Sequence, residues 1–403
     1  PMITTLARDS EQATELLRLR GQLAKASVSK YAAMERAADA AGYIRGMIQF
    51  YGANRTGRAA ARLVQLHNMR KNAMPMKPID ELRFAREVLY SGDFELFCML
   101  WDEPLDVLSQ LTRTALIADD NHIFAPVDFS AIEARKLAWA AGEEWRLEVF
   151  RTHGKIYEAS AAAMFHVPIE SITKASPLRA KGKVAELALG YQGGEGALIR
   201  MGALDMGLQL EELDPIKVAW RAANLKIAGL SYKNEPPGFW ERMNDAAMRA
   251  MRLGGRHEVD HGIEFRKEYG ILFMRLPAGR DLCYVKPSVK EGDYGPEIHF
   301  WGLDQITKQW VEQKSYGGRW TENFCQASSR DLLYHKLALM EDRGLHHYVR
   351  FHVHDEAVPS IPITGAQDTV RRIEDLFAEP VSWAPGLPLR GDGFLTPFFR
   401  KDD

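Results

Sequence analysis

The sequence predicts an α+β fold, because segments with strand periodicity alternate with longer segments that carry helix signals. From 349 to 353, apolar residues alternate with polar ones, which is the period of a half-buried strand. A second β-prone run covers 357–361, so the two runs predict a tight hairpin. Residues 9–41 are rich in Ala, Glu, Leu and Arg and stop at a glycine, and 365–378 is amphipathic, so both are predicted to be helical.

Two adjacent acids, Asp355 and Glu356, lie at the tip of the predicted hairpin. Like charges this close repel each other, and a divalent cation would relieve the repulsion. A second stretch, 122–128, ends on Asp128 and precedes a helix-like segment. Brought together, these carboxylates would supply hard oxygen ligands suited to two Mg²⁺ ions in phosphoryl transfer. A solvated turn at the hairpin and a helix cap at Asp128 are the alternatives.

A third informative stretch predicts a helix from 176 to about 192. Ser176 can cap it, Pro177 suits its first turn, and the glycine pair at 193–194 ends it. Side chains spaced four residues apart form one stripe on this helix, with two cations at one end and an aromatic ring at the other. The stripe consists of Arg179, Lys183, Leu187 and Tyr191. It suits an incoming nucleotide, with the cations on the phosphates; a solvated basic face with a core tyrosine is the alternative.

Between residues 51 and 79 there is no Asp or Glu, yet several basic residues occur there: Arg55, Arg58, Arg62, Arg70, Lys71 and Lys77. Such a run predicts a surface that follows a nucleic-acid backbone. A solvated basic loop is the alternative.

Composition places the chain among globular proteins. It has 403 residues, of which 46% are hydrophobic, and its net charge of −2 argues against indiscriminate nucleic-acid binding. Three scattered cysteines without metal-ligand spacing indicate a reducing interior. No run approaches membrane-spanning length, so no membrane partner is expected.

The three stretches resemble, in order, the conserved motifs of the family A DNA polymerases (the bacterial DNA polymerase I family). The segment DFSAIEAR at 128–135 resembles motif A, 179–191 resembles motif B, and VHDEAV at 353–358 resembles motif C. The match runs from about Ser29 to the end of the chain and is similar to phage-encoded members. It implies a right-hand polymerase with an antiparallel palm sheet, helical fingers and a reduced thumb.

The resemblance also implies roles at the reaction centre. Asp128 and Asp355 would bind two Mg²⁺ ions, for which Mn²⁺ can substitute, with the Phe129 carbonyl as a further ligand and Glu356 as an auxiliary acid. Glu133 would block the sugar 2′-hydroxyl while hydrogen-bonded to a tyrosine. The expected nucleotide-binding residues are Arg179, Lys183, Leu187, Tyr191, Glu133 and Tyr157. Two of them depart from the family pattern: Leu187 replaces an aromatic residue, and Tyr157 replaces a histidine.

For the primer-template, the resemblance implies contacts from two segments and the hairpin. By position they are Arg58, Gln65, Asn68, Gln326, Arg330 and His354. His67 replaces the usual glutamine beside Asn68, and Ala131 replaces a glutamine in motif A.

The resulting domain prediction has four parts. They are a reduced thumb (1–50), a first palm part (51–138), fingers with a β-rich insertion (139–318) and a second palm part (319–403). Residues 80–118 are predicted to form two helices divided at Pro104. Too few residues precede Asp128 for an exonuclease domain, so no proofreading is expected.

The predicted function is template-directed addition of dNTPs to a primer 3′-hydroxyl by two-metal phosphoryl transfer, with Lys183 stabilising the leaving pyrophosphate. The expected partners are primer-template DNA, dNTPs and a possible processivity factor. A monomer in the cytoplasm of a bacterial or phage-infected cell is expected. A single-subunit RNA polymerase and a non-catalytic primer-template binding module are the alternatives.

Overall fold

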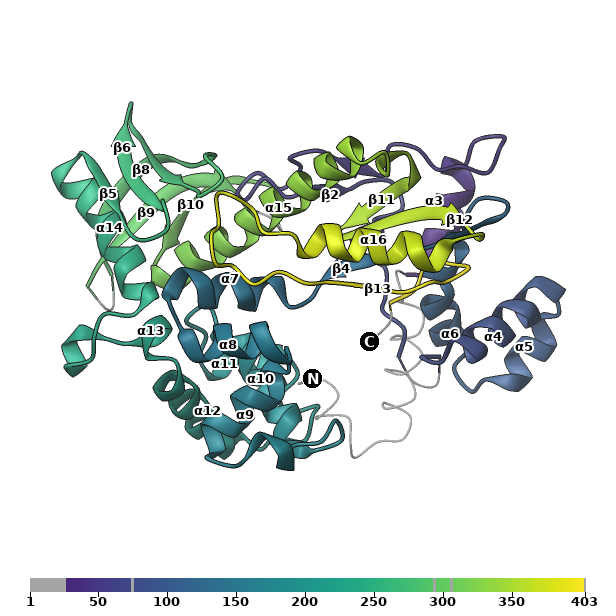
Figure 1. Ribbon diagram of the computed structural model, residues 1–403, viewed down its shortest axis with the longest axis horizontal. Helices are drawn as coiled ribbons and strands as arrows, with labels where there is room; N and C mark the ends of the chain where they lie inside the picture. Colours follow the sequence, from purple (N-terminus) through teal and green to yellow (C-terminus); the bar gives the residue numbers. More distant parts are fainter. Residues whose placement is uncertain (1–26, 74–75, 293–294, 305–306, 402–403) are drawn as a thin grey trace.

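The computed structural model describes residues 27–73, 76–292, 295–304 and 307–401. Throughout these ranges the strands pair in antiparallel fashion, within sheets of two, six and five strands. Helices pack against both larger sheets (Figure 1). The predicted α+β class is therefore confirmed.

The five-stranded sheet contains the predicted hairpin. Its strands lie in the order β11-β12-β4-β13, and β3 pairs with the far end of β12. Their bounds are β3 (His122–Phe124), β4 (Val127–Phe129), β11 (Val349–Val353), β12 (Glu356–Pro362) and β13 (Gly391–Gly393). Two strands that are more than 200 residues apart in the sequence, β4 and β12, are thus direct neighbours.

Two helices pack against this sheet, α15 (Gly317–Asp342) and α16 (Ala366–Ala378), and α7 (Ile132–Ala141), which follows β4, packs against α15. The amphipathic pattern of α16 predicts its contact face, because Val370, Ile373 and Phe377 are all buried. Phe377 packs on Phe129 of β4, with 4.6 Å between the ring centroids. This contact fixes α16 directly behind the strand that carries Asp128.

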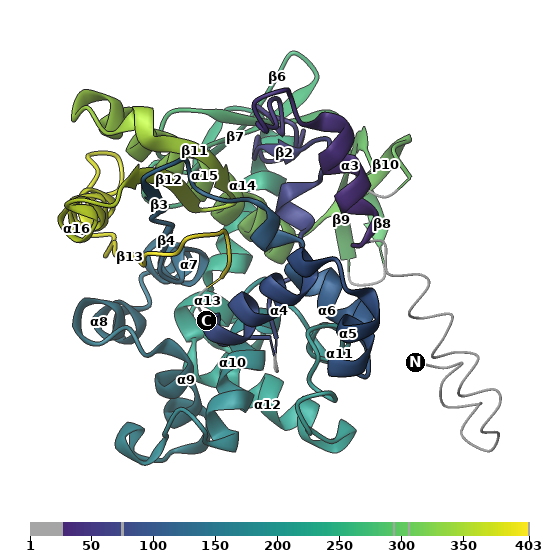
Figure 2. The same cartoon turned by 90° about the vertical axis from the view of Figure 1, so that its right-hand side faces the viewer.

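A group of helices lies below the two larger sheets in Figures 1 and 2. It consists of α8 (Glu144–Thr152), α9 (Ile156–Phe165), α10 (Pro177–Leu189), α11 (Glu195–Arg200), α12 (Leu210–Ala223) and α13 (Leu225–Ala228). Gly182 permits the close approach of α10 to α9, since a Cβ there would lie 2.2 Å from the Tyr157 carbonyl oxygen. The predicted cap is also present, because the Ser176 hydroxyl accepts a hydrogen bond from the Leu178 amide at 3.3 Å.

The β-rich segment forms a six-stranded sheet in sequential order, packed against α14 (Phe239–Leu253). Its strands are β5 (Arg256–Glu258), β6 (Glu264–Glu268), β7 (Ile271–Arg275), β8 (Asp281–Gly292), β9 (Gly295–Leu303) and β10 (Trp310–Ser315). Leu272, Met274 and Tyr284 are buried on its inner face, whereas Trp301 and Trp310 are partly exposed on the outer face. Burial therefore alternates along β7, with Leu272 and Met274 inside and Arg275 exposed.

The segment before Asp128 is more finely divided than predicted. Residues 9–26 of the predicted helix lie outside the described residues, and the described helix α3 (Ser29–Ala37) ends before Gly42. Strands β1 (Ile48–Gln49) and β2 (Ala60–Ala61) pair with each other. The prediction of two helices over 80–118 is wrong, because three occur: α4 (Ile79–Ser91), α5 (Phe94–Leu100) and α6 (Pro104–Leu111). Gly92 and the Asp93 cap divide the first predicted helix, and Pro104 begins the last one.

Short 3-10 helices connect several of these elements: Leu66–Asn68, Arg113–Ala115, Ile169–Ser171, Ser231–Lys233 and His346–Tyr348. Among the described helices, none has the length and hydropathy needed to cross a membrane.

Candidate active site

Strand pairing brings the three predicted acids together. Glu356, the first residue of β12, lies directly opposite Asp128 on β4. Asp355 precedes it in the hairpin turn, and its carbonyl accepts a hydrogen bond from the Phe129 amide at 3.4 Å. Glu356 is 1% exposed. The sheet thus concentrates three carboxylates at the end of one hairpin.

This concentration changes the proton affinities of two of the acids. The pKa of Glu356 is raised to about 7, mainly by burial and to a smaller degree by the Asp128 charge, while Lys401 opposes the rise. Desolvation and the charge of Asp128 raise the pKa of Asp355 well above its ordinary value. Both carboxyl groups therefore resist joint ionisation unless additional positive charge is nearby.

Lys401 supplies positive charge at this point, and sequence reasoning missed it. Its Nζ lies 3.1 Å from Oδ2 of Asp128 and 3.0 Å from Oε2 of Glu356. These two carboxylates raise the pKa of Lys401 despite its burial. A lone lysine in a polar tail carries no motif, so the sequence held no signal for it. Asp392 on β13 was also missed, although it lies directly opposite Asp128 in the sheet register.

The donor set fits a hard divalent cation. Asp128 Oδ1 is a buried oxygen without a hydrogen-bond partner among the described residues, and carboxylate oxygens are the ligands that Mg²⁺ prefers. Within the described ranges, no group of three His, Cys, Asp or Glu side chains is already arranged as a metal site. Two of the carboxylate oxygens, Oδ2 of Asp128 and Oε2 of Glu356, contact the Lys401 ammonium.

Glu133, in the first turn of α7, has both carboxylate oxygens engaged. Tyr191 donates its hydroxyl proton to Oε2 at 2.7 Å, as the resemblance implies. Arg58 donates to Oε1 at 2.6 Å, a contact that was not predicted. The turn from β4 into α7 passes through Ala131, whose φ of +49° lies in the left-handed region that favours glycine. This turn directs Glu133 toward the same side of the sheet as the acids.

Three of the four residues of the predicted stripe lie on α10, and the position of the fourth needs a correction. Lys183 and Leu187 are exposed on α10. Arg179 donates to Glu158 Oε1 at 2.6 Å and lies over the Tyr157 ring, 5.5 Å from its centroid. The predicted helix end at 193–194 is wrong: α10 ends at Leu189, so Tyr191 lies just beyond it. Tyr191 is therefore held in place by its hydrogen bond to Glu133 and not by the helix.

Of the predicted primer-template residues, Gln65 and Asn68 are exposed, and His354 packs on His67 with 4.9 Å between the ring centroids. Gln326 donates to Glu322 at 3.0 Å. Arg330 donates to the Gly57 carbonyl at 3.1 Å and is stacked on the Tyr334 ring. In this structure Arg330 therefore supports the segment that bears Arg58.

The run of basic residues is not one continuous free surface. Arg70 pairs with Asp106 at 2.5 Å, and Arg55 contacts Gln313 of the six-stranded sheet. Arg62, Lys71 and Lys77 are exposed. These partners, Asp106 and Gln313, lie outside 51–79, so the lack of acids within that stretch did not mean that its basic residues are unpaired.

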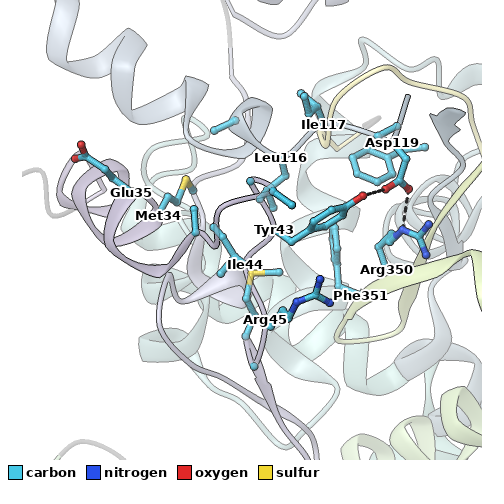
Figure 3. A pocket seen from close by; sticks show the side chains of 18 of the residues that line it. Met34, Glu35, Tyr43, Ile44, Arg45, Leu116, Ile117, Asp119, Arg350 and Phe351 are labelled. Atoms are coloured by element: carbon cyan, nitrogen blue, oxygen red, sulfur yellow. Dashed lines mark hydrogen bonds and ion pairs between the residues drawn. The ribbon is translucent and has the colours of Figure 1, made fainter. Parts of the chain in front are cut away.

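A cavity of about 800 Å³ lies between the N-terminal segment and β11, and its lining contains none of the predicted site residues. Figure 3 shows its apolar wall, which includes Met34 and Leu116, and a polar group at one end. There Asp119 accepts hydrogen bonds from Tyr43 and Arg350, each at 2.8 Å. These contacts and the Ser360 hydroxyl outweigh partial burial and lower the pKa of Asp119 to about 2. Asp119, Tyr43 and Arg350 line one end of the cavity, and none of them belongs to the carboxylate site.

No protein-family model matches the sequence. Over 99% of its length the chain is 47% identical to a DNA polymerase of Bacillus phage SP02, of which it spans 61%. It is 23% identical, over 66% of its length, to a DNA polymerase of Mycobacterium phage D29, of which it spans 33%. Among solved structures, 98% of the chain matches the POL domain of Pol1 from M. smegmatis in complex with DNA primer-template and dNTP. This match has a TM-score of 0.60 at 15% identity and covers 55% of that chain.

Proposed function

Since this chain is a relative of the phage DNA polymerases and has the fold of a POL domain, we propose that it is a template-directed DNA polymerase. The similarity to phage DNA polymerases supports the resemblance that the three motifs indicate. We assign the chain to family A on the order of those motifs. Its substrates would be a primer-template and dNTPs, the molecules present in the complex of the M. smegmatis neighbour.

The observation that carries this proposal is the cross-strand pair of Asp128 and Glu356, with Asp355 in the adjoining turn. Strand pairing places acids from two distant segments side by side, near Glu133, which accepts a hydrogen bond from the Tyr191 hydroxyl just beyond α10. A binding module would not need this arrangement, because gathered acids cost stability that a nearby cation must offset.

In the proposed reaction, Asp128, Asp355 and the Phe129 carbonyl would hold two divalent cations, Mg²⁺ or Mn²⁺. Such ions activate the attacking hydroxyl and neutralise charge on the transferred phosphate. Lys183, exposed on α10, would bind the triphosphate and stabilise the leaving pyrophosphate. Arg179 would also bind the triphosphate, after its hydrogen bond to Glu158 is replaced by one to a phosphate oxygen. Glu133 would exclude a sugar 2′-hydroxyl, because its held carboxylate fills the space that such a hydroxyl needs.

Primer extension on a defined template tests the proposal. The intact chain is compared with Asp128→Ala and Asp355→Ala, using Mg²⁺ and either dNTPs or rNTPs. Asp368→Ala is the matched control, because Asp368 is an exposed acid on α16 with a side chain that is 84% exposed. We expect dNTP extension by the intact chain and the control, and none by the other two variants while primer-template binding persists.

The same assay separates the alternatives. Efficient extension with rNTPs would favour an RNA polymerase. Binding of primer-template without extension in any divalent metal would favour a non-catalytic module. Absence of proofreading, a monomeric state and a processivity factor stay predictions, each requiring its own measurement.

A further inference from the structure

The carboxylate site already contains a positive charge in the protein alone. The Lys401 ammonium bridges Asp128 and Glu356 at 3.1 and 3.0 Å. Its side chain is only 16% exposed, and that of Glu356 is 1% exposed. A lysine this enclosed is unusual unless it neutralises nearby acids.

The backbone that carries Lys401 is firmly attached to the fold. Thr396 and Phe124 exchange backbone hydrogen bonds of 2.9 and 3.0 Å, and the Phe399 amide donates to the Leu116 carbonyl at 2.8 Å. The Phe399 ring is buried against Phe351, with 5.0 Å between the ring centroids. The position of Lys401 is therefore set by the packed segment that precedes it.

A fixed backbone and a flexible side chain give Lys401 a limited range of movement. Its four-carbon stem ends in a compact charge that can exchange partners without movement of the chain. Asp128 is the more accessible of its two partners, with a side chain that is 40% exposed, whereas Glu356 is buried. The ammonium can thus leave Asp128 while keeping Glu356.

We propose that Lys401 is a placeholder cation, which neutralises Asp128 and Glu356 in the metal-free protein and competes with a divalent cation for Asp128. This inference rests on the proposed function, in which Asp128 is a metal ligand. It assigns Lys401 a positioning role: the residue keeps the acids in place before metal binds and sets the affinity with which metal enters.

Mn²⁺ titration followed by electron paramagnetic resonance tests the competition, using the full chain without DNA or nucleotide. Lys401→Met is expected to bind Mn²⁺ about tenfold more tightly than the intact chain, because no charged group has to be displaced. Lys401→Arg retains a cation and should remain close to the intact chain. Lys290→Met is the matched control, since Lys290 pairs with Glu312 at 2.7 Å on the distant six-stranded sheet.

Thermal unfolding supplies a second readout that does not depend on catalysis. Without its placeholder, Lys401→Met should melt at a lower temperature than the intact chain in EDTA, and Mn²⁺ should raise its melting temperature by more. Lys401→Gln, which keeps a polar side chain, provides the same comparison if the methionine variant does not fold.

The outcomes are distinguishable. If the intact chain binds no Mn²⁺ in a manner abolished by Asp128→Ala, both the proposed metal site and this inference are overturned. If Asp128-dependent binding is present but the methionine and glutamine variants bind Mn²⁺ equally or more weakly, only the placeholder role is overturned.

Discussion

The guanidinium of Arg58 lies 2.6 Å from one oxygen of Glu133, whose other oxygen accepts the Tyr191 hydroxyl at 2.7 Å. The carboxylate is therefore held in one orientation from both sides, although its side chain is 38% exposed. Arg58 belongs to the predicted primer-template segment, and Tyr191 follows α10, the helix that is proposed to bind the nucleotide. Glu133 thus joins the two surfaces that primer and nucleotide are proposed to occupy.

Loss of this carboxylate should weaken sugar discrimination. Glu133→Ala opens the space that a 2′-hydroxyl requires, so the ratio of rNTP to dNTP incorporation is expected to rise by about ten- to a hundredfold. Single-nucleotide incorporation with each matched rNTP and dNTP measures the ratio. Glu148→Ala, an exposed acid on α8, should leave it unchanged. Equal ratios in both variants would mean that another residue selects the sugar.

The buried ion pair between α8 and α10 should be important for stability. Glu186 accepts hydrogen bonds from Arg146 at 2.8 Å, Ser160 at 2.6 Å and Trp220 at 2.9 Å. Arg146→Met leaves this buried carboxylate without its cation, so the free energy of unfolding should fall by about 3–5 kcal/mol. Urea denaturation measures the loss. Arg151→Met removes an exposed pair with Glu144 and should cost far less stability, because water screens such pairs; equal costs would contradict the prediction.

The same carboxylate predicts a pH dependence. Burial alone would raise the pKa of Glu186, but Arg146 and the other donors lower it below its ordinary value of 4.5. A lowered folded-state pKa means that the contribution to stability is present above the unfolded-state pKa and is lost as pH falls through the folded-state pKa. Glu186→Gln should therefore reduce the decline of stability below about pH 4.5. Urea midpoints measured across acidic pH test this; an unchanged decline would exclude Glu186 as a contributor.

Local patterns predict the parts of this molecule whose causes are local. The alternation at 349–353, the Ser176 cap and the amphipathic 365–378 helix each depend on neighbours in sequence, and each is found as expected. The division of 80–118 into three helices was not predicted. Pro104 marks only the last boundary, whereas Gly92 and the Asp93 cap make the first one.

Long-range partners were harder to foresee. Arg58 lies in a stretch without Asp or Glu and was expected to contact the primer-template, yet it pairs with Glu133 across the fold. The pair of Lys401 and Asp128 is likewise made by the fold, although Asp402 and Asp403 follow Lys401 in the sequence. Pairing between segments that are 75 and 273 residues apart follows from the tertiary fold, and no local periodicity encodes it.

Close packing of α9 and α10 makes Gly182 sensitive to substitution. Alanine favours helix by up to about 1 kcal/mol relative to glycine, but its Cβ would lie 2.2 Å from the Tyr157 carbonyl oxygen. The clash should dominate, so Gly182→Ala is expected to lower the free energy of unfolding by about 1–3 kcal/mol. Gly196→Ala on α11 meets only an ordinary 3.5 Å contact with Arg200 and should be neutral or stabilising. Urea denaturation of both variants decides; stabilisation by Gly182→Ala would show that the helices separate without cost.

Two lysines on α10 differ in their surroundings and should differ in function. Lys181 is paired with Glu212 at 2.5 Å, whereas Lys183 is exposed on the stripe that ends near Tyr191. If Lys183 stabilises charge on the leaving pyrophosphate, Lys183→Met should reduce kcat/KM for a dNTP by about a hundredfold, the usual effect of removing one such group. Lys181→Met should leave kcat/KM nearly unchanged, because its cation already serves a carboxylate. Steady-state kinetics with a saturating primer-template measures both, and a binding titration verifies that DNA affinity is retained. Comparable losses in the two variants would indicate a general effect of positive charge on this helix instead of a specific phosphate contact by Lys183.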